Sequence, residues 1–471
     1  MSDTASKVNI LFPVENMNRE MDFRLFLACS HVKPSNRIFI GQHDVLYRMA
    51  VKTGMRSGVY VGKHLFRQLP AFKDYARYHA MKESQFAVIH LDEEGGLCDG
   101  DEDRWRWQLL EVLFDPRCLE AEDYICTWGD FQRDFYKSLN PRCSEHIIAT
   151  GHPRFDLYKP AYRKYFDADV ARITARYQDF ILVNTKFVYG NNGLGLADTF
   201  SKRIGYDPSD LQKRLTFVAR FAYEQRTMSD FVRLINHLSL RFPHVNIVVR
   251  PHQAEDWEFY RTIFRGIPNL HVVHEGTVGP WLLACKVLIH NSCTTGVEAY
   301  LTDTNLINYK SVVDAQHDLF LADIFGVQCF TDDEVVQNVE AMLKAGRSGP
   351  PPARFDDRAH SLMANFRQNS VAAFLQVIEE AEARQARLPQ EWNPGRVGQV
   401  ELSREMIDRA KSVMRPLFPA KQRQYKALRS NFLGLDRRTI ERKVRTLEEL
   451  VGKRVRTTFY SSALLSIETA T

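Results

Sequence analysis

One stretch of the sequence decides the fold: Val287-Leu288-Ile289-His290-Asn291-Ser292-Cys293-Thr294-Thr295-Gly296-Val297-Glu298-Ala299-Tyr300. It begins as an apolar run, passes through a turn rich in hydroxyl groups and continues with a helical pattern. Continuous apolar runs of this kind are typical of parallel strands that are buried on both faces. The stretch therefore predicts the strand, turn and helix of a parallel α/β unit.

The turn in this unit carries groups that suit a phosphate. A helix N-terminus offers unpaired N–H groups and a partial positive charge, which favour an anion. Gly296 would let the backbone approach a ligand closely, and Glu298 is placed to accept hydrogen bonds from a ribose or a base. Simple N-capping by a serine or threonine is the alternative interpretation. We predict that the nucleotide-binding residues here are His290, Asn291, Ser292, Thr294, Thr295 and Glu298.

The same alternation of short strands and longer helices runs through both halves of the chain. In the second half the expected strands are Val245–Arg250, Leu270–Val273, Val287–His290 and Asn305–Asn308. In the first half they are Val8–Phe12, Arg37–Gly41, Gly58–Val61, Phe86–Leu91, Asp123–Cys126, His146–Thr150 and Phe180–Asn184. We expect two Rossmann-like parallel sheets that face each other across a cleft, with ligands at the carboxyl ends of their strands.

The chain of 471 residues is too long for one hydrophobic core. We expect an N-terminal domain over residues 1–205 that holds the acceptor and catalytic groups, and a nucleotide-binding domain over 206–358. A crossover helix over 359–392, within which Ala359–Arg387 has a helical pattern, leads to a basic helical extension over 393–471. The hydrophobic fraction of 44% and charged fraction of 26% are those of an ordinary globular protein.

The compartment and the partners are indicated by simple features of composition. No run approaches the roughly 18 apolar residues of a membrane span, and the N-terminus lacks the pattern of a secretory signal. Eight cysteines are scattered without CxxC pairs, which favours free thiols and gives no zinc site. These features predict a cytoplasmic protein.

Charge is unevenly distributed along the chain. Residues 401–471 hold 16 Lys and Arg against eight Asp and Glu, a net charge of +8, so the remainder carries −3 of the total of +5. A basic tail suggests an anionic partner, and we expect peripheral contact with a membrane surface rather than with nucleic acid. A merely solvated helical face is the alternative.

A second phosphate-binding candidate follows the strand Val245–Arg250. Arg250 and His252 would emerge at the end of that strand, where a guanidinium and an imidazole can steady a leaving phosphate. An ordinary loop histidine is the alternative. Two further cleft residues, Asn184 and Lys186, follow the strand Phe180–Asn184.

In the first half, carboxylates follow the strand Phe86–Leu91. Neighbouring carboxylates such as Glu93 and Glu94 raise each other's pKa, which suits a general acid or base near neutral pH. An acidic surface turn is the alternative, since more acidic residues follow. Asp99-Gly100-Asp101 has the form of a metal-binding DxD motif, but we interpret it as a solvated loop and expect no metal.

A further motif, Gly151-His152-Pro153-Arg154-Phe155-Asp156, follows the strand His146–Thr150. Arg154 is a candidate for binding an anionic sugar, and Asp156 is a candidate catalytic carboxylate. A surface arginine with an aspartate at a helix start is the alternative.

Together these motifs resemble those of the bacterial surface-carbohydrate biosynthesis proteins, a group of GT-B glycosyltransferases. The resemblance spans most of the chain from Val8 to about Leu388. It rests on Leu91-Asp92-Glu93-Glu94-Gly95-Gly96, Gly151–Asp156, Asn184-Thr185-Lys186-Phe187, and the segment from Glu275-Gly276-Thr277-Val278-Gly279-Pro280-Trp281 to Ala299-Tyr300.

The resemblance implies a cofactor-free transferase that moves Kdo (3-deoxy-octulosonic acid) or a similar acidic sugar from its CMP ester to a surface polysaccharide or lipopolysaccharide acceptor. In related enzymes an acidic-acidic-glycine motif supplies a catalytic carboxylate, here Glu93-Glu94-Gly95. A Ser/Thr motif holds CMP, here Ser292 with Thr294 and Thr295. A retaining route through a sugar–enzyme adduct would make Asp156 the nucleophile.

One motif departs from the pattern, and two other functions fit the same features. The family's His-Pro is replaced at His252 by His-Gln, while a true His-Pro stands at His152-Pro153. The first alternative is a CDP-glycerol-type polyol phosphate transferase of the same fold. The second is a non-catalytic GT-B scaffold that binds glycans or proteins.

Overall fold

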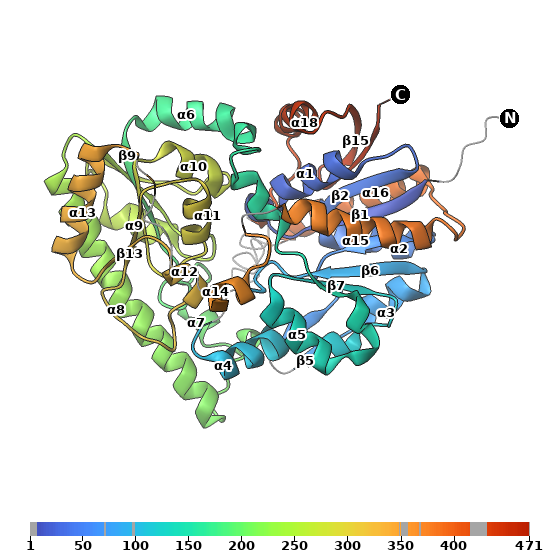
Figure 1. The fold of residues 1–471 in the computed structure, drawn as a ribbon, viewed down its shortest axis with the longest axis horizontal. Coiled ribbons are helices and arrows are strands. Elements are labelled where there is room, and N and C mark those ends of the chain that lie inside the picture. The colour runs from blue at the N-terminus through green and yellow to red at the C-terminus, as the bar shows by residue number, and fades with distance from the viewer. Residues whose placement is uncertain are drawn as a thin grey trace.

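The computed structural model describes residues 7–69, 72–96, 99–347, 349, 357–366, 369–414 and 431–470. Figure 1 shows two α/β domains side by side, each built around its own sheet. Each sheet has a core of parallel strands, so the predicted class of two Rossmann-like domains in a GT-B arrangement is confirmed. Among the described residues, none of the helices combines the length and apolar character of a membrane span.

The sheet of the first domain has the order β15-β16-β2-β1-β3-β6-β7-β8. Its parallel strands are β1 (Val8–Val14), β2 (Asn36–Gln42), β3 (Gly58–Val61), β6 (Phe86–Leu91), β7 (Tyr124–Thr127) and β8 (Ile147–Ala149). From β1 the chain first moves outward to β2 and then returns to the other side at β3. This reversal creates a switch point, where ligands bind in open α/β sheets.

The sheet of the second domain has the order β11-β10-β9-β12-β13-β14, and its pairings are parallel. Its strands are β9 (Phe180–Asn184), β10 (Asn246–Arg250), β11 (Leu270–Val272), β12 (Val287–His290), β13 (Leu306–Tyr309) and β14 (Val327–Cys329). The assignment of Phe180–Asn184 to the first half was wrong, because β9 pairs with β10 and β12 at the centre of this sheet. The sequence of an apolar strand does not indicate which sheet the strand will join.

Helices cover the faces of both sheets. In the first part of the chain they are α1 (Asp22–His31), α2 (His43–Lys52), α3 (Ala76–Glu83), α4 (Glu102–Trp107), α5 (Asp130–Leu139) and α6 (Asp167–Tyr177), with a small hairpin of β4 (Arg67–Leu69) and β5 (Phe72–Asp74). In the second they are α7 (Leu196–Thr199), α8 (Leu211–Arg241), α9 (Trp257–Ile263), α10 (Val278–Ala284), α11 (Thr295–Leu301), α12 (Phe320–Asp323) and α13 (Asp332–Ala345). Buried side chains of both domains, among them Phe166 and Trp281, belong to one continuous apolar core.

The segment expected as one crossover helix contains two. They are α14 (Asp357–Leu362) and α15 (Ser370–Gln385). Helix α15 lies against the first sheet, where the amide of Gly58 donates to Gln385 Oε1 at 3.0 Å and His31 Nε2 lies 2.7 Å from Glu382 Oε2. The chain thus returns to the first domain after completing the second.

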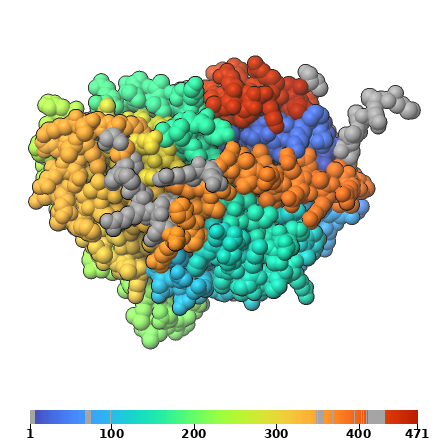
Figure 2. Space-filling view, in the orientation of Figure 1, coloured from blue at the N-terminus to red at the C-terminus, as the bar shows by residue number. Residues whose placement is uncertain are grey.

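The C-terminal region corrects the expectation of a purely helical extension. After α16 (Pro394–Met414) and α18 (Arg437–Val451), the strands β15 (Val455–Ser461) and β16 (Leu464–Thr469) form a hairpin. The inner strand β16 pairs antiparallel with β2, since its apolar side chains, Leu464 and Leu465 among them, are buried against the first domain. Figure 2 shows this segment in red, packed on the N-terminal residues in blue.

Ion pairs hold part of the basic tail to the body of the protein. Lys443 of α18 pairs with Asp22, and Arg442 Nη2 lies 3.1 Å from Asp169 Oδ1. The excess positive charge of the tail and the negative charge of the body therefore partly neutralise each other within the molecule.

Candidate functional site

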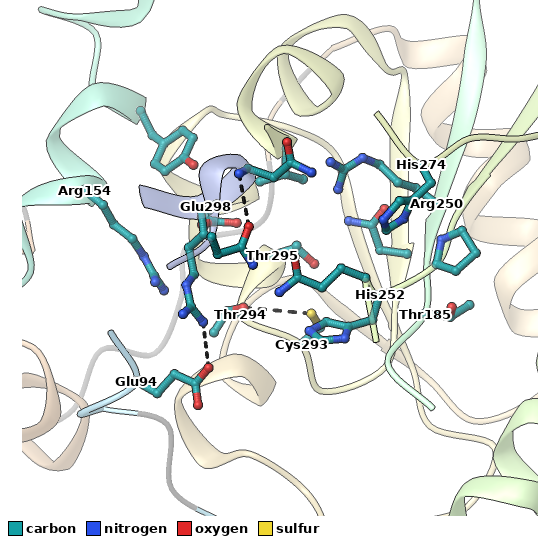
Figure 3. Close-up of a pocket in the computed structure, with 18 residues that line it drawn as sticks. Glu94, Arg154, Thr185, Arg250, His252, His274, Cys293, Thr294, Thr295 and Glu298 are labelled. Atoms are coloured by element: carbon teal, nitrogen blue, oxygen red, sulfur yellow. Dashed lines mark hydrogen bonds and ion pairs between the residues drawn. The ribbon is translucent and has the colours of Figure 1, made fainter. Parts of the chain in front are cut away.

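A pocket with an empty volume of about 890 Å³, its open mouth included, lies between the two domains. Its walls come from the loops that follow β1, β6 and β8 of the first sheet and β9, β10, β11 and β12 of the second (Figure 3). This is the position that the carboxyl-end rule predicts for a ligand. The residues that line the pocket are Asn16, Asn18, Arg19, Glu94, Arg154, Tyr158, Asn184, Thr185, Arg250, Pro251, His252, Gln253, His274, Val278, Cys293, Thr294, Thr295 and Glu298.

Glu94 is the carboxylate that the first domain brings into the pocket. Its Oε1 accepts a hydrogen bond of 2.8 Å from Arg19 Nη1, and Arg19 also contacts the buried Glu20 at 3.0 Å. Partial desolvation in the pocket raises the pKa of Glu94, but the positive charges of Arg19 and Lys63 outweigh it and lower the pKa below its usual value. Glu94 is therefore ionised at neutral pH, as a general base must be.

Glu93 lies outside the pocket, although it is the adjacent residue. Its carboxylate is fully buried, 3.0 Å from His152 Nε2 and 3.5 Å from Arg24 Nη2. Burial also lowers the pKa of His152 to about 4, so Arg24 supplies the positive charge that neutralises Glu93 at pH 7. The expectation that either glutamate could handle the acceptor proton is corrected here, because Glu93 has no access to a ligand.

Arg154 reaches the pocket from the first domain, as predicted. Its guanidinium packs over the rings of Trp128 and Phe155, at 5.1 Å and 4.7 Å from their centres, and Nη1 donates to the Glu93 carbonyl oxygen at 3.0 Å. These contacts fix a side chain that is only 4% exposed. Figure 3 shows Arg154 extending toward the pocket from the same side as Glu94.

Asp156 does not reach the pocket, which corrects its assignment as the nucleophile. The side chain is fully buried, Lys159 Nζ contacts Oδ1, and the amide of Val371 donates to Oδ2 at 2.7 Å. Both oxygens are thus engaged, and the carboxylate anchors the N-terminus of α15. A short turn of 3-10 helix over Pro153–Tyr158 turns Arg154 and Tyr158 toward the pocket and Asp156 away from it.

In the second domain, Arg250 and His252 line the pocket at the end of β10. Burial lowers the pKa of Arg250 to about 10, so its charge persists at neutral pH, and the guanidinium donates to the Gly276 carbonyl. The imidazole of His252 opens onto the pocket, yet the surrounding protein removes much of its hydration and lowers its pKa to about 4. His252 is therefore a neutral hydrogen-bonding group at pH 7.

The loop that carries His252 is held by a residue that the sequence did not reveal. Glu255 is buried and accepts hydrogen bonds from the His252 amide at 3.0 Å, from Thr185 Oγ1 at 2.7 Å and from the Tyr260 hydroxyl at 2.7 Å. Burial raises its pKa to about 7. This carboxyl group fixes the ends of β9 and β10 relative to each other.

The turn after β12 divides into residues that build it and residues that face the pocket. Ser292 has φ of +39°, a backbone conformation that is strained for a residue other than glycine. Its side chain bonds to Asp323, its amide donates to Asn308 Oδ1 at 3.0 Å, and Lys186 bonds to its carbonyl. Because these bonds overdetermine the turn, they can maintain the strain.

Four residues that were predicted to bind a ligand therefore form hydrogen bonds that stabilise the turn and its surroundings instead. Lys186 and Ser292 are used within the turn, and His290 Nδ1 accepts from the Cys293 amide at 3.1 Å. The Asn291 side chain donates to the Tyr309 carbonyl at 3.1 Å. None of the four lines the pocket, whereas Thr294, Thr295 and Glu298 do.

Gly296 also has a different role from the one expected. A Cβ atom at this position would lie 2.7 Å from His290 Cε1 and 3.0 Å from Nε2. The glycine therefore makes room for a buried histidine beneath the turn. It does not provide a close approach for a ligand.

Several polar atoms at the pocket have no hydrogen-bond partner in the described structure. Both amide atoms of Asn184 are buried and unpartnered, and so are Thr295 Oγ1 and the Nε atoms of Arg154 and Arg250. Burying such groups without a partner is unfavourable by about 1–3 kcal/mol each. Groups of this kind at one pocket favour a polar ligand that completes their hydrogen bonds.

The charge of the pocket favours an anion. Three arginines, Arg19, Arg154 and Arg250, face two carboxylates, Glu94 and Glu298. Burial raises the pKa of Glu298, and the arginines outnumber the carboxylates among the lining residues. The arrangement can bind one or two anionic groups and can present one ionised carboxylate to a reacting hydroxyl.

One group of described residues is spaced to hold a metal ion, and it lies beside the pocket. It consists of Glu15, Glu20 and His64, but Arg19 pairs with Glu20 and Lys63 lies 3.9 Å from Glu15. In the acidic loop, the Asp99 carboxylate contacts Arg104 at 3.1 Å and the Asp101 carboxylate accepts from the amide of Arg104. These carboxylates are engaged with protein donors.

Several lining residues were not among the predicted site residues. They are Asn16, Asn18, Arg19, Tyr158, Thr185, Pro251, Gln253, His274, Val278 and Cys293. The rule that ligands meet strand ends could have found the group Asn16–Arg19, which follows β1 directly. Tyr158 is the last residue of a short helical turn and does not follow a strand directly, so no such signal marks it.

No protein-family model and no curated protein sequence matches the chain. Among solved structures, the chain is similar to UDP-GlcNAc 2-epimerase from Methanocaldococcus jannaschii, in complex with UDP-GlcNAc and UDP, at 10% identity and a TM-score of 0.42, over 79% of this chain and 99% of that one. It is also similar to Staphylococcus aureus MnaA with UDP, at 12% identity and a TM-score of 0.44, over 82% and 100% of the chains. A third similar structure is a variant of the wall teichoic acid polymerase TagF with CDPG, at 10% identity and a TM-score of 0.41, over 81% and 90%.

Proposed function

We propose that the protein is a transferase that moves a sugar from a nucleotide-activated donor to a glycan acceptor in the pocket between its domains. One observation carries the proposal: at the carboxyl ends of both sheets, arginines and unpartnered polar groups face an ionised carboxylate across one pocket. The cationic wall suits the donor phosphate, and the carboxylate suits the acceptor hydroxyl.

The second domain would bind the leaving phosphate. Arg250 and the hydroxyl groups of Thr294 and Thr295 are the donors for its oxygens, and the neutral imidazole of His252 adds a further hydrogen bond. Fixed donors that face the position where negative charge develops stabilise a transition state without reorganising. Helix α11 has seven residues, so its dipole is a minor contributor beside these side chains.

Glu94 would activate the acceptor. As the acceptor oxygen forms its bond to the anomeric carbon, its proton passes to a Glu94 carboxylate oxygen. The bond between the sugar and the phosphate breaks, and its electron pair leaves with the phosphate. With Asp156 buried and both of its oxygens engaged, direct displacement replaces the retaining route through that residue.

The proposed donor is a CMP-activated acidic sugar such as Kdo, and the proposed acceptor is a surface polysaccharide or lipopolysaccharide. Arg19 and Arg154, on the wall opposite the residues proposed to bind phosphate, match the carboxylate of such a sugar. CDP-glycerol also carries two anionic groups, so it would fit the same arginines. Analysis of the products formed from CMP-Kdo and from CDP-glycerol separates the two donors.

Calorimetric titration with CMP, CDP and UDP tests the proposal. The wild-type chain should bind one of these nucleotides, and Arg250→Gln together with Thr294→Ala should weaken that binding at least tenfold. Arg241→Gln is the matched control, since Arg241 is exposed and pairs with Glu340 at 2.7 Å, away from the pocket. A nucleotide affinity that survives the double change intact would overturn the assignment.

A further inference from the structure

A stack of planar side chains borders the pocket beside Arg250, one of the residues proposed to bind phosphate. The ring of His274, which follows β11, lies nearly parallel to the ring of Trp257 at the start of α9, with 5.2 Å between centres and 25° between planes. On Trp257, the guanidinium of Arg261 lies 4.2 Å from the ring centre. Trp257 therefore packs against both His274 and Arg261.

Only the histidine of this stack reaches the pocket. His274 is among the lining residues, whereas Trp257 and Arg261 are not. The loop after His274 is joined to the phosphate-binding wall, because Arg250 donates to the Gly276 carbonyl. Figure 3 shows His274 next to Arg250. A flat group packed on His274 would thus lie beside an anion held by Arg250.

The chemistry of the ring suits an uncharged aromatic partner. Desolvation and the charge of Arg250 lower the pKa of His274 below its usual value, so the imidazole is neutral at pH 7. A neutral ring that already packs on Trp257 has little freedom to lose when another ring stacks on it. Val278, at the start of α10, adds an apolar surface to the same pocket.

We propose that His274, supported by Trp257, is the stacking platform for the nucleobase of the donor. The inference rests on the proposed nucleotide-dependent function and adds to it the residues that distinguish a nucleotide from a sugar phosphate. Stacking depends on the flat face of a base and not on its edges, so the platform should accept cytosine and uracil alike. Any choice between the two bases must come from hydrogen bonds elsewhere.

Comparing nucleotides with a ligand that lacks the base isolates this contribution. The affinities of CMP, UMP and ribose 5-phosphate are measured for the full-length chain by calorimetry. His274→Ala should weaken CMP and UMP about tenfold and leave ribose 5-phosphate unchanged. His274→Phe, which restores a flat ring, should bind CMP within about threefold of the wild type. His244→Ala is the control, because His244 is an exposed histidine of the same domain outside the pocket.

Trp257→Ala provides a second, independent variant. It leaves His274 in place but removes its support, so CMP affinity should fall by less than in His274→Ala while ribose 5-phosphate again stays unchanged. An equal loss for CMP and ribose 5-phosphate in His274→Ala, or a phenylalanine variant as weak as the alanine variant, would overturn the platform alone. A wild-type chain that binds neither CMP nor UMP would overturn the proposed function and the platform with it.

Discussion

The two walls of the pocket are built on different principles. In the first domain each glutamate has a counter-charge within the protein, Arg19 for Glu94 and Arg24 for Glu93, while Arg154 Nε has no hydrogen-bond partner among the described residues. In the second domain, uncharged side chains at the pocket, such as Asn184 and Thr295, have buried polar atoms without a hydrogen-bond partner in the part of the chain that the structure describes. The charge state of the first wall is therefore set by its own ion pairs, whereas the second wall adds uncharged polar groups whose hydrogen bonds a ligand can complete.

Removing the carboxylate of the first wall should have the largest effect. Glu94→Gln keeps the shape of the side chain but removes the base, so kcat should fall about a hundredfold or more, the range expected for general base catalysis. Nucleotide affinity should change little, because the second wall is intact. Turnover and calorimetry on the same preparation check both, with Glu379→Gln as control, since Glu379 is exposed and pairs with Lys33 away from the pocket. A loss of nucleotide binding equal to the loss of kcat would show that the two walls are not separate.

The neighbouring glutamate should affect stability instead of chemistry. Glu93→Gln removes the carboxylate that pairs with the buried guanidinium of Arg24, and breaking a buried pair in this way costs about 3–5 kcal/mol. Urea unfolding followed by fluorescence measures the loss. If the variant is as stable as the wild type but inactive, Glu93 has a chemical role that its burial does not explain.

Asp156 tests the correction of the nucleophile. Asp156→Asn weakens the contact with Lys159 and the link to α15, so stability should fall by about 1–3 kcal/mol. The folded variant should keep kcat within about fivefold of the wild type, since general effects of packing on the pocket are small beside the loss of a nucleophile. The anomeric configuration of the product gives a second readout, and retention abolished by this change would restore Asp156 to the reaction.

The paired state of the first wall should also be visible in the pH profile. Arg19 stabilises the ionised form of Glu94, so Arg19→Gln should raise the pKa of Glu94 and move the acidic limb of the kcat/KM profile to higher pH. His252 has a pKa of about 4 and stays neutral from pH 5 to 8, so nucleotide affinity should not follow its titration in that range. An acidic limb unchanged in Arg19→Gln would mean that Glu94 is not the titrating base.

The sequence was sufficient for the parts of this design that follow from periodicity and from strand ends. Apolar runs such as Val287–His290 identified the parallel strands, and residues at or just beyond strand ends, such as Arg250 and Glu94, do line the pocket. The direction of a side chain could not be predicted from the sequence. Glu93 and Glu94 are identical neighbours, and only the path of the loop buries the first and turns the second into the pocket. The same limit applies to Ser292, whose hydroxyl looked like a ligand donor but bonds to Asp323.

The smallest expected effect concerns the basic tail. It differs from both walls because some of its basic residues are paired with the first domain and others are exposed. Lys443 and Arg442 pair with the first domain, whereas Arg438 and Arg445 of α18 are exposed. If the tail attracts an anionic membrane, Arg438→Glu with Arg445→Glu should reduce binding to phosphatidylserine vesicles at low salt, and salt should reduce wild-type binding in the same way. Near the surface each basic residue contributes only about 1 kcal/mol, and CMP affinity should not change. If the wild type and the double variant bind vesicles equally, the role of the tail is structural: it extends the first sheet and packs α18 on α1.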